Sequence, residues 1–439
     1  MTSTPDRVLS RPVPRPNEGV WPGLATPPPG GAARARIAES LFRRAVRPLE
    51  VRVELPGGER LGAGGPGSPV LRLVRPAAFY RRIGTNATIG FGESYMVGDW
   101  TATDLADVLT PFAARLSTLV PPVLHRLRRL VVPRTPTEEH NTIDGARDNI
   151  HRHYDLSNEL FAAFLDDTMT YSSAWFGSSS PGLDGTVASP MAEDLAGAQL
   201  RKIDGVLDMA GVRPGQHILE IGTGWGALAI RAARRGARVT TLTISAEQAR
   251  FAERRIAEAG VADRVQVLLR DYREARGSYD AVVSVEMIEA VGAEYWPAYF
   301  RTLDRLLAPG GRVGLQSITM GHDRMLATRG SYSWIHKYVF PGGLIPSVTA
   351  IEQNLAAHTG LRIERRRGLG PDYATTLALW RARFLANWRQ VAALGFDETF
   401  RRMWEFYLAY CEAGFRVGYL DVQQLALSRP GPRDERVQP

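Results

Sequence analysis

The stretch HILEIGTGWGALAIRAARRGARVTTLTIS, residues 217–245, decides the fold. Its apolar run 217–221 predicts a strand, and the glycines that follow predict a tight turn. The pattern from Ala227 to Arg235 predicts a helix, which Gly236 ends. A second strand is expected over 239–242. A strand, a helix and a strand of this length form a βαβ unit, which implies a parallel sheet.

The turn has the form E-x-G-x-G-x-G, and its residues include Glu220, Gly222, Gly224, Trp225 and Gly226. Glycines are needed where a ligand approaches the backbone. A dinucleotide turn, G-x-G-x-x-G, needs a glycine where this chain has Ala227, whereas the observed form is similar to that of S-adenosylmethionine (SAM) methyltransferases. The second strand ends in threonines 241 and 243 instead of the usual ribose-binding acid. A ligand-free turn is the alternative for the glycines alone.

The alternation of strands and helices continues after this stretch. Strands are predicted over 265–269, 279–285 and 312–318, with helices over 246–259 and 295–307. We therefore expect an α/β fold with a doubly wound, Rossmann-like sheet and a smaller α+β N-terminal domain. Ligands of such sheets bind at the carboxyl ends of the strands. The polar residues at these ends are Thr243, Ser245, Gln248, Asp271, Tyr272, Glu286, Glu289 and Gln316.

Composition indicates a globular, cytoplasmic protein. The chain has 439 residues, enough for two domains, and 44% of them are hydrophobic. No apolar run reaches the length of a membrane span, and the N-terminus lacks an apolar signal region. The single cysteine, Cys411, excludes an intrachain disulfide and a cysteine-rich metal site, and no metal is expected.

The positive charge is concentrated in the N-terminal third. Residues 1–135 hold 19 Arg and 10 Asp or Glu, a net charge of +9, whereas the whole chain carries +8. Such a surface favours an anionic partner, either nucleic acid or an acidic lipid surface. Arginine-rich composition without a partner is the alternative. In the helix predicted over 33–47, Ile37, Leu41 and Val46 are expected to face inward.

Composition also suggests the domain limits. We expect a disordered tail over 1–32, an N-terminal lipid- or membrane-associated domain over 33–135, and a linker over 136–148. A catalytic domain should occupy 149–428, followed by a disordered tail over 429–439. A helix is expected near 121–133 and another from Ser157. The aromatic insertion 320–347 is interpreted as a lid or as a packing cluster, and residues 373–427 are expected to be helical.

Several stretches together resemble the family of cyclopropane-fatty-acyl-phospholipid synthases and mycolic acid methyltransferases. They span residues 90–380 in the family's order and include GFGESYMVGDW, HYDLSNELFAAFLDDTMTYSSAWF, LEIGTGWG, VVSVEMIEAVG and YVFPGGLIPS. SVEMIEAVG, LQSITM and the final YLAYCEAGFRVGYLDV are similar to the actinobacterial branch, which includes methyltransferases of tuberculostearic acid synthesis.

The resemblance implies that SAM donates a one-carbon unit to the cis double bond of an unsaturated phospholipid acyl chain. Attack on the sulfonium methyl leaves a carbocation, which aromatic faces stabilise and which must be kept from water. Direct proton loss from the new methyl closes a cyclopropane, and a hydride shift before proton loss gives a methylene product. The aromatic candidates are Tyr171, Trp175, Tyr332, Trp334, Tyr338, Phe340 and Tyr373.

In the family the base is held to be a bound bicarbonate. The resemblance assigns it to Glu289, Tyr373, Ser173, Gln316 and the backbone at Ile318. Ser173 and Gln316 depart from the family's usual cysteine and histidine, although a hydroxyl and an amide still donate hydrogen bonds. The SAM contacts carried over in the same way are Tyr171, Ser172, Gly222, Gly224, Thr243, Gln248, Asp271 and Tyr272.

Two other functions are weighed against this enzyme. A catalytically silent lipid-binding homologue is suggested by Ser173 and Gln316, and a nucleic-acid methyltransferase by the basic third. The latter lacks an interleaved basic and aromatic module, so no nucleic-acid partner is expected. The expected setting is the membrane surface at the inner face of the cell membrane. A homodimer and a separate reductase for a methylene product are further expectations.

Overall fold

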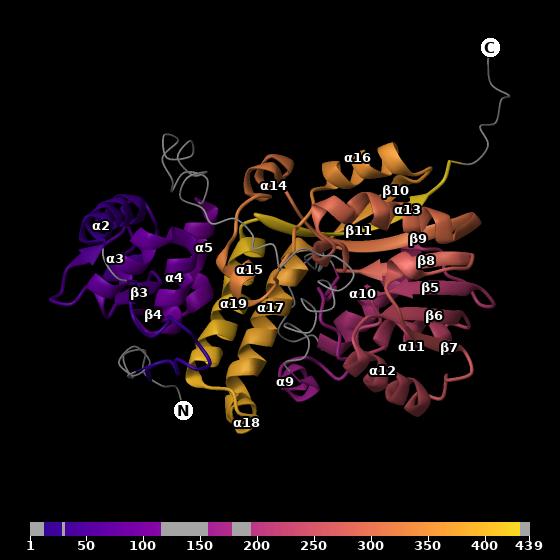
Figure 1. The fold of residues 1–439 in the computed structure, drawn as a ribbon, viewed down its shortest axis with the longest axis horizontal. Helices are drawn as coiled ribbons and strands as arrows, with labels where there is room; N and C mark the ends of the chain where they lie inside the picture. Colours follow the sequence, from indigo (N-terminus) through magenta and orange to yellow (C-terminus); the bar gives the residue numbers. More distant parts are fainter. Residues whose placement is uncertain (1–12, 29–30, 116–156, 178–194, 431–439) are drawn as a thin grey trace, which may run out of the picture. The chain divides into compact units, whose positions relative to one another are not determined.

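The computed structural model describes residues 13–28, 31–115, 157–177 and 195–430 (Figure 1). The predicted helix near 121–133 and the predicted linker 136–148 lie outside these residues. The chain divides into two compact units. Unit 1 comprises 1–135, 330–341 and 377–419, and unit 2 comprises 136–329, 342–376 and 420–439. The segments 330–341 and 377–419, which we assigned to the catalytic domain, therefore group with the N-terminal residues.

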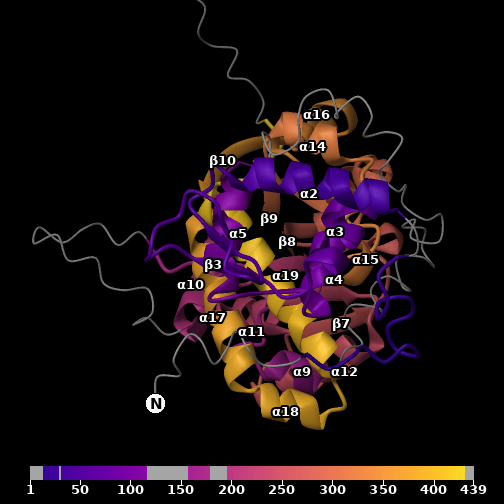
Figure 2. The same ribbon diagram turned by 90° about the vertical axis from the view of Figure 1, so that its left-hand side faces the viewer.

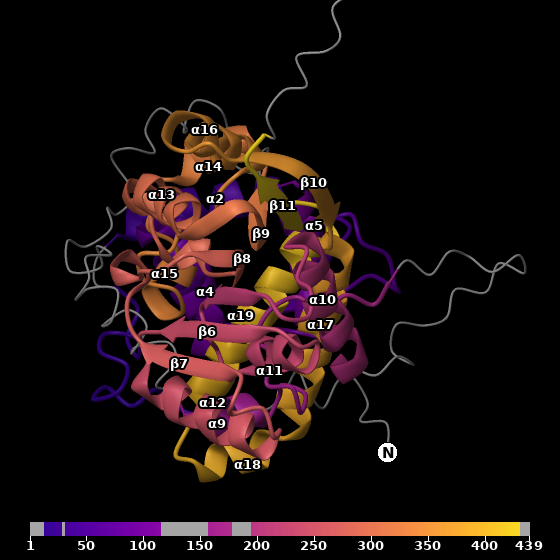
Figure 3. The same ribbon diagram turned by 90° about the vertical axis from the view of Figure 1, so that its right-hand side faces the viewer.

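Unit 2 contains a seven-stranded sheet in the order β10-β11-β9-β8-β5-β6-β7, whose strands are labelled in Figure 1 and seen from another side in Figure 3. Strands β6, β5, β8 and β9 pair in parallel, as do β6 and β7, whereas β11 is antiparallel to both β9 and β10. The predicted doubly wound sheet is confirmed, with a mixed edge. The strands are β5 (His217–Ile221), β6 (Arg238–Thr243), β7 (Val265–Leu269), β8 (Tyr279–Val285), β9 (Leu307–Met320), β10 (Arg362–Gly368) and β11 (Leu420–Ser428).

Helices cover both faces of this sheet. Ile218 of β5 packs in a core formed with α10, α11 and α12, whereas its neighbour Leu219 packs in the opposite core with α13 and α16. This alternation follows the two-residue period of a strand. The helices of unit 2 are α9 (Asn158–Ala162), α10 (Leu195–Met209), α11 (Ala227–Arg234), α12 (Ala246–Glu258), α13 (Trp296–Leu306), α14 (His322–Thr328) and α16 (Val348–His358).

One C-terminal strand corrects the sequence prediction. Residues 373–427 were expected to be helical, but β11 occupies 420–428 between β9 and β10. Helix α17 (Gly370–Ala386) belongs to unit 2 as far as Thr376 and to unit 1 from Leu377.

No helix among the described residues is long and apolar enough to cross a membrane.

Unit 1 is a small α+β structure (Figure 2). Its four-stranded sheet has the order β2-β1-β3-β4. An aromatic cluster that includes Trp100, Phe91 and Phe406 forms part of its core. The elements are α2 (Ala32–Val46), β1 (Arg52–Glu54), β2 (Arg60–Leu61), β3 (Val70–Leu73), α3 (Pro76–Thr85), α4 (Ala87–Met96), β4 (Trp100–Ala102), α5 (Leu105–Ala114), α15 (Trp334–Tyr338), α18 (Trp388–Ala393) and α19 (Glu398–Arg416).

Two predictions for unit 1 change. Ala38, Phe42 and Val46 form the buried side of α2, while Ile37 and Leu41, expected inside, are exposed. Residues 13–28, which composition assigned to a tail, include the buried Leu24, whose carbonyl accepts a hydrogen bond from Arg82.

The aromatic insertion also packs within unit 1. The Trp334 ring lies 4.7 Å from that of Phe406, and the Tyr338 hydroxyl donates to Glu93 at 2.8 Å. Trp334 is 4% exposed. For these two rings the structure therefore agrees with the packing interpretation of the insertion.

Candidate functional site

The glycine turn closes the end of β5 as predicted. Gly222, Gly224 and Gly226 have φ angles of 97°, 51° and 89°, which only glycine adopts readily. A Cβ added at Gly224 would meet no atom of the described residues within 4 Å, whereas one at Gly226 would lie 3.2 Å from the Cβ of Ala252. Gly226 is thus needed for packing, and Gly224 leaves open space beside the backbone. That space fits a ligand such as SAM.

Polar residues surround the end of the next strand. The Thr243 hydroxyl donates to Oε1 of Gln248 at 3.1 Å and accepts from the backbone N–H of Ser245 at 3.1 Å. The Ser245 hydroxyl caps α12 by accepting from the N–H of Gln248 at 3.2 Å. The N-terminus of α12 carries a partial positive charge that suits the carboxylate of SAM. That these residues hold the cofactor stays a prediction from the sequence.

Two buried ionisable groups lie near the turn. Oε2 of Glu220 accepts from the Thr241 hydroxyl at 2.6 Å, and desolvation raises the pKa of Glu220 to about 8. Lys202 of α10 is 1% exposed and donates to the Ser172 hydroxyl at 2.5 Å. Desolvation lowers the pKa of Lys202 to about 8, against the attraction of Glu286, Asp166 and Glu220.

Sequence reasoning missed Lys202 as a site residue. It is one of only two lysines in a chain whose other basic residues are 52 arginines. It stands on the inward face of an amphipathic helix, next to the buried Ile203. A lysine at an apolar position of an arginine-rich protein was the signal that could have revealed it.

Aromatic rings pack against the turn from the α9 segment. The Trp225 ring lies 4.9 Å from that of Phe161, and its Nε1 donates to Oδ1 of Asn158 at 2.7 Å. The Tyr171 ring lies 5.2 Å from the same Phe161. Ser157 begins α9 by accepting a hydrogen bond from the N–H of Leu160, as predicted. The predicted SAM residues Tyr171 and Trp225 are therefore brought together through one shared ring.

Asp271 and Tyr272 have partners of their own. The Asp271 carboxylate accepts from the Arg273 backbone N–H and side chain, including Nη2 at 2.7 Å, and so caps the turn that follows β7. The Tyr272 ring packs edge-on against Tyr299 in the core. These contacts describe a capping role for Asp271.

The five residues predicted to hold bicarbonate are divided between two carboxylates, those of Glu286 and Glu289. Three of them hydrogen-bond to Glu286. Its Oε1 accepts from the backbone N–H of Ser173 at 2.9 Å and from Nε2 of Gln316 at 2.8 Å, and its Oε2 accepts from the Tyr373 hydroxyl at 3.0 Å. The Ser173 hydroxyl, expected to face the base, donates to the Ala174 carbonyl at 2.9 Å.

Gln316 is fixed by a neighbouring amide. Gln424 lies opposite it in the β11–β9 register and donates from Nε2 to Oε1 of Gln316 at 3.0 Å. The same Nε2 donates to the Lys202 carbonyl at 3.0 Å. Because Oε1 of Gln316 is taken by this donor, its Nε2 faces Glu286.

Glu289 has a different environment. Its Oε1 accepts from the Ile318 N–H and from the Ser317 hydroxyl, the latter at 3.0 Å. Its Oε2 is buried and has no hydrogen-bond partner among the described residues. Desolvation and the neighbouring Glu286 charge raise the pKa of Glu289 to about 8. Of the predicted set, only Ile318 contacts Glu289.

These contacts do not fit a bound bicarbonate. The donors assigned to it at Ser173, Gln316 and Tyr373 are occupied by a protein carboxylate, and the one at Ile318 by another. The guanidinium of Arg367 lies 4.0 Å from the centre of the Trp175 ring, so one face of this predicted cation-stabilising ring already holds a cation.

Comparison with known proteins agrees with the sheet and its glycine turn. Residues 141–425 match the family model described as mycolic acid cyclopropane synthetase. Tuberculostearic acid methyltransferase UfaA1 of Mycobacterium tuberculosis is 53% identical over 94% of this chain and 96% of its own length. Cyclopropane-fatty-acyl-phospholipid synthase of Escherichia coli is 33% identical over 81% of this chain and 87% of its own length.

A solved structure extends this similarity to the fold. The crystal structure of mycolic acid cyclopropane synthase CmaA1 complexed with SAH and CTAB matches with a TM-score of 0.57 and 33% identity. The match covers 64% of this chain and 97% of that chain. The fold and its glycine-turn site define a SAM-dependent methyltransferase. Within that class, the chain belongs to the mycolic acid cyclopropane synthetase family.

Proposed function

We propose that this protein transfers a one-carbon unit from SAM to the cis double bond of an unsaturated phospholipid acyl chain. The product is a mid-chain methylene group, the precursor of a methyl branch, or a cyclopropane. The 53% identity to a tuberculostearic acid methyltransferase over 94% of the chain carries this proposal. The tight hydrogen bonding around Glu286 supports catalysis over a silent lipid-binding role, because a silent homologue has no need to maintain it.

SAM supplies an electrophilic methyl group, and the chain's own residues prepare the site for it. The backbone at Gly224 offers the close approach, and Thr243, Ser245 and Gln248 offer polar contacts. The carbocation left on the lipid has to lose a proton, so a base is required near the acyl chain. The carboxylates of Glu286 and Glu289 are the acidic groups on the turn after β8.

We also propose that unit 1 brings the enzyme to an anionic membrane surface, at the inner face of the cell membrane. On α2, Ile37 is 61% exposed and Leu41 is 37% exposed, and Arg34, Arg36 and Arg44 are exposed beside them. Apolar side chains between cations suit the interface of an anionic bilayer.

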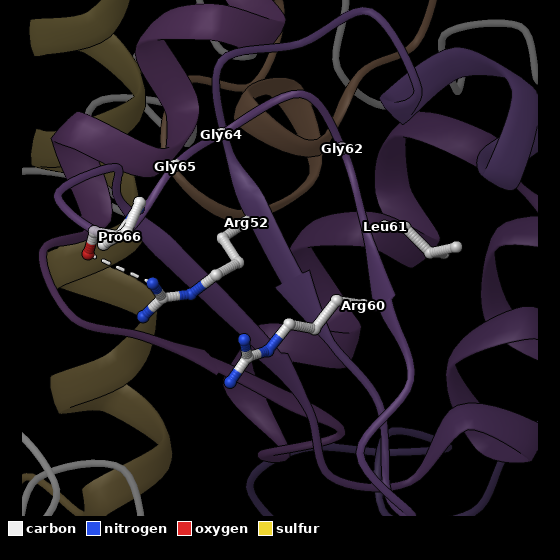
Figure 4. A pocket seen from close by; sticks show the side chains of 7 residues that line it. All are labelled: Arg52, Arg60, Leu61, Gly62, Gly64, Gly65 and Pro66. Atoms are coloured by element: carbon white, nitrogen blue, oxygen red, sulfur yellow. Dashed lines mark hydrogen bonds between the residues drawn. The ribbon is translucent and has the colours of Figure 1, made fainter.

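A second basic feature of unit 1 also suits an anionic membrane surface. Arg52 and Arg60 line a hollow of about 380 Å³ beside a glycine-rich loop that includes Gly62 and Gly64 (Figure 4). The Arg52 guanidinium donates to the Pro66 carbonyl at 3.1 Å, which holds it at the hollow. Guanidinium groups in such a place suit lipid phosphates.

The main proposal is tested with the purified full-length chain, SAM labelled in its methyl group, and vesicles of unsaturated phospholipid. Label should enter the acyl chains, and saturated vesicles serve as the control. Mass spectrometry with fragmentation or hydrogenation then separates methylene from cyclopropane, since both add the same mass. Unlabelled lipid in all vesicles would leave the silent homologue as the better explanation.

We also propose two partners for the enzyme, a separate reductase and a second copy of this chain. A methylene product would need a separate reductase to become a methyl branch, and a homodimer is the proposed assembly. Adding a cell extract with a reduced nicotinamide cofactor should convert a methylene product into a methyl-branched one. Light scattering of the purified chain measures the mass of the assembly.

A further inference from the structure

The carboxylate of Glu286 collects donors from three separate parts of unit 2. Ser173 lies before α10, Gln316 lies on β9, and Tyr373 lies on α17. Ser173 and Gln316 donate to Oε1, and Tyr373 donates to Oε2. Donors brought from such distant positions along the chain specify one rotamer of one carboxylate, which is how a reactive group is preorganised.

The backbone at this position is also unusual. Glu286 has a φ of 48°, one of three positive φ values among non-glycine residues in the described ranges. This conformation is unfavourable for a residue with a Cβ. The Glu286 N–H donates to the Gln316 carbonyl at 2.8 Å, so the strained residue is held by the same neighbour that binds its side chain. Glycine would suit this backbone better, so the side chain is retained against a local cost.

The two carboxylates of this turn differ in electrostatic environment. Desolvation raises the pKa of Glu286, whereas the Lys202 ammonium and three hydrogen-bond donors act in the opposite direction and favour its charged form. Glu289 accepts from Ile318 and Ser317 and has no nearby ammonium among its interactions with the described residues, and desolvation and the Glu286 charge raise its pKa to about 8. A pair held so close favours one charged and one protonated member. The contacts assign the charge to Glu286 and the proton to Glu289.

We propose that the Glu286 carboxylate is the base of the reaction and replaces a bound bicarbonate. This inference rests on the proposed function. After the methyl group has bonded to one alkene carbon, the neighbouring carbon is a cation. Glu286 takes a proton from the alkyl cation, so an O–H bond forms as a C–H bond breaks. The C–H electron pair fills the empty orbital, as a new C–C bond in a cyclopropane or as a C=C bond after a hydride shift.

The first test compares wild type with Glu286→Gln in the labelled-SAM assay. Glutamine keeps the size and accepts hydrogen bonds but cannot take the proton, so we expect a loss of about a hundredfold or more in lipid labelling. Binding of S-adenosylhomocysteine, measured by calorimetry, should stay within about threefold of wild type. Glu289→Gln is the matched variant and should lose less, because the residue it replaces is already neutral. Equal losses in the two variants would overturn the assignment.

The second test uses Glu286→Gly, which relieves the positive φ and leaves the three donors open. Its labelling activity should be restored in part by added acetate, formate or bicarbonate, whereas wild type should be indifferent to bicarbonate in buffer stripped of carbon dioxide. A purely structural role for Glu286 predicts no rescue by small acids. Wild type that requires bicarbonate would refute the inference while leaving the proposed function intact. Wild type that labels no lipid in any buffer would refute the function itself.

Discussion

The Lys202 ammonium donates a hydrogen bond to the Ser172 hydroxyl at 2.5 Å from a side chain that is only 1% exposed. It is the cation that acts on both Glu286 and Glu220. An ammonium in such a place is costly unless nearby carboxylates carry charge. Lys202 therefore joins the glycine turn to the proposed base, because its charge acts on the carboxylates at both positions.

Replacing Lys202 should move the pH profile of catalysis. In Lys202→Met, Glu286 loses the opposite charge that lowers its pKa, so the carboxylate should ionise only at higher pH. The acid limb of kcat/KM is expected to shift upward by about one pH unit or more. The other lysine offers a matched control, since Lys337 is 42% exposed and pairs with Glu93 in unit 1. Lys337→Met should leave the limb unmoved, and an unmoved limb in Lys202→Met would contradict the electrostatic role.

Removing the side-chain hydroxyl should have different effects on activity at Ser173 and at Tyr373. Ser173 contacts Glu286 through its backbone N–H, so Ser173→Ala should keep lipid labelling within about threefold of wild type. The Tyr373 hydroxyl donates to Oε2, so Tyr373→Phe should raise the pKa of Glu286 and cost about tenfold at neutral pH. Steady-state labelling across a pH series checks both. A larger loss in the serine variant than in the tyrosine variant would contradict these contacts.

The glycine turn predicts opposite outcomes for two alanine variants. At Gly224 a Cβ meets no protein atom, so Gly224→Ala should cost only about 1–2 kcal/mol of unfolding free energy for its positive φ. It should weaken S-adenosylhomocysteine binding at least tenfold by filling the ligand's space. At Gly226 the Cβ meets Ala252, so Gly226→Ala should cost about 2–4 kcal/mol. Urea unfolding and calorimetry measure the two effects, and unchanged affinity in Gly224→Ala would place SAM elsewhere.

The buried carboxylate of Glu220 should make stability depend on pH. Its pKa is about 8 in the fold against 4.5 for the free side chain, so the folded state binds the extra proton between these values. The contribution of this protonation to the free energy of unfolding is fully present below pH 4.5 and is lost as pH rises through about 8. In Glu220→Gln the decline of unfolding free energy over this window should be smaller than in wild type. Urea titrations at several pH values test this, and parallel curves for the two proteins would contradict it.

The sequence predicted the parts of this protein that local chemistry determines. The glycine turn, the strands β5 to β9 and the Ser245 cap follow from apolar runs, glycines and capping residues close along the chain. Strand β10 was missed because arginines dominate it, as suits the edge of a sheet, and β11 because it follows a long helix. Ile37 was misassigned because α2 has two apolar stripes and only packing decides which is buried.

The central contacts of the site could not be predicted from local sequence patterns, because they join residues far apart in the chain. Glu286 lies 113 residues from Ser173 and 87 residues from Tyr373, and no spacing rule joins such positions. The family resemblance placed Ser173, Gln316 and Tyr373 together with Glu289 around a bound bicarbonate and did not include Glu286. Glu286 meets those donors from a backbone with a φ of 48°, which no pattern in the sequence predicts for a glutamate.

The exposed face of α2 gives the last prediction. Replacing Ile37 and Leu41 together by serine removes the apolar groups between exposed arginines and should reduce sedimentation with anionic vesicles at least tenfold. Leu394→Ser, at a side chain that is 43% exposed in unit 1, is a control for lost surface hydrophobicity. Wild-type binding should also weaken as salt rises or as anionic lipid is withdrawn, because the arginines act through charge. Vesicle binding that is indifferent to the serine substitutions and to salt would show that α2 does not face the membrane.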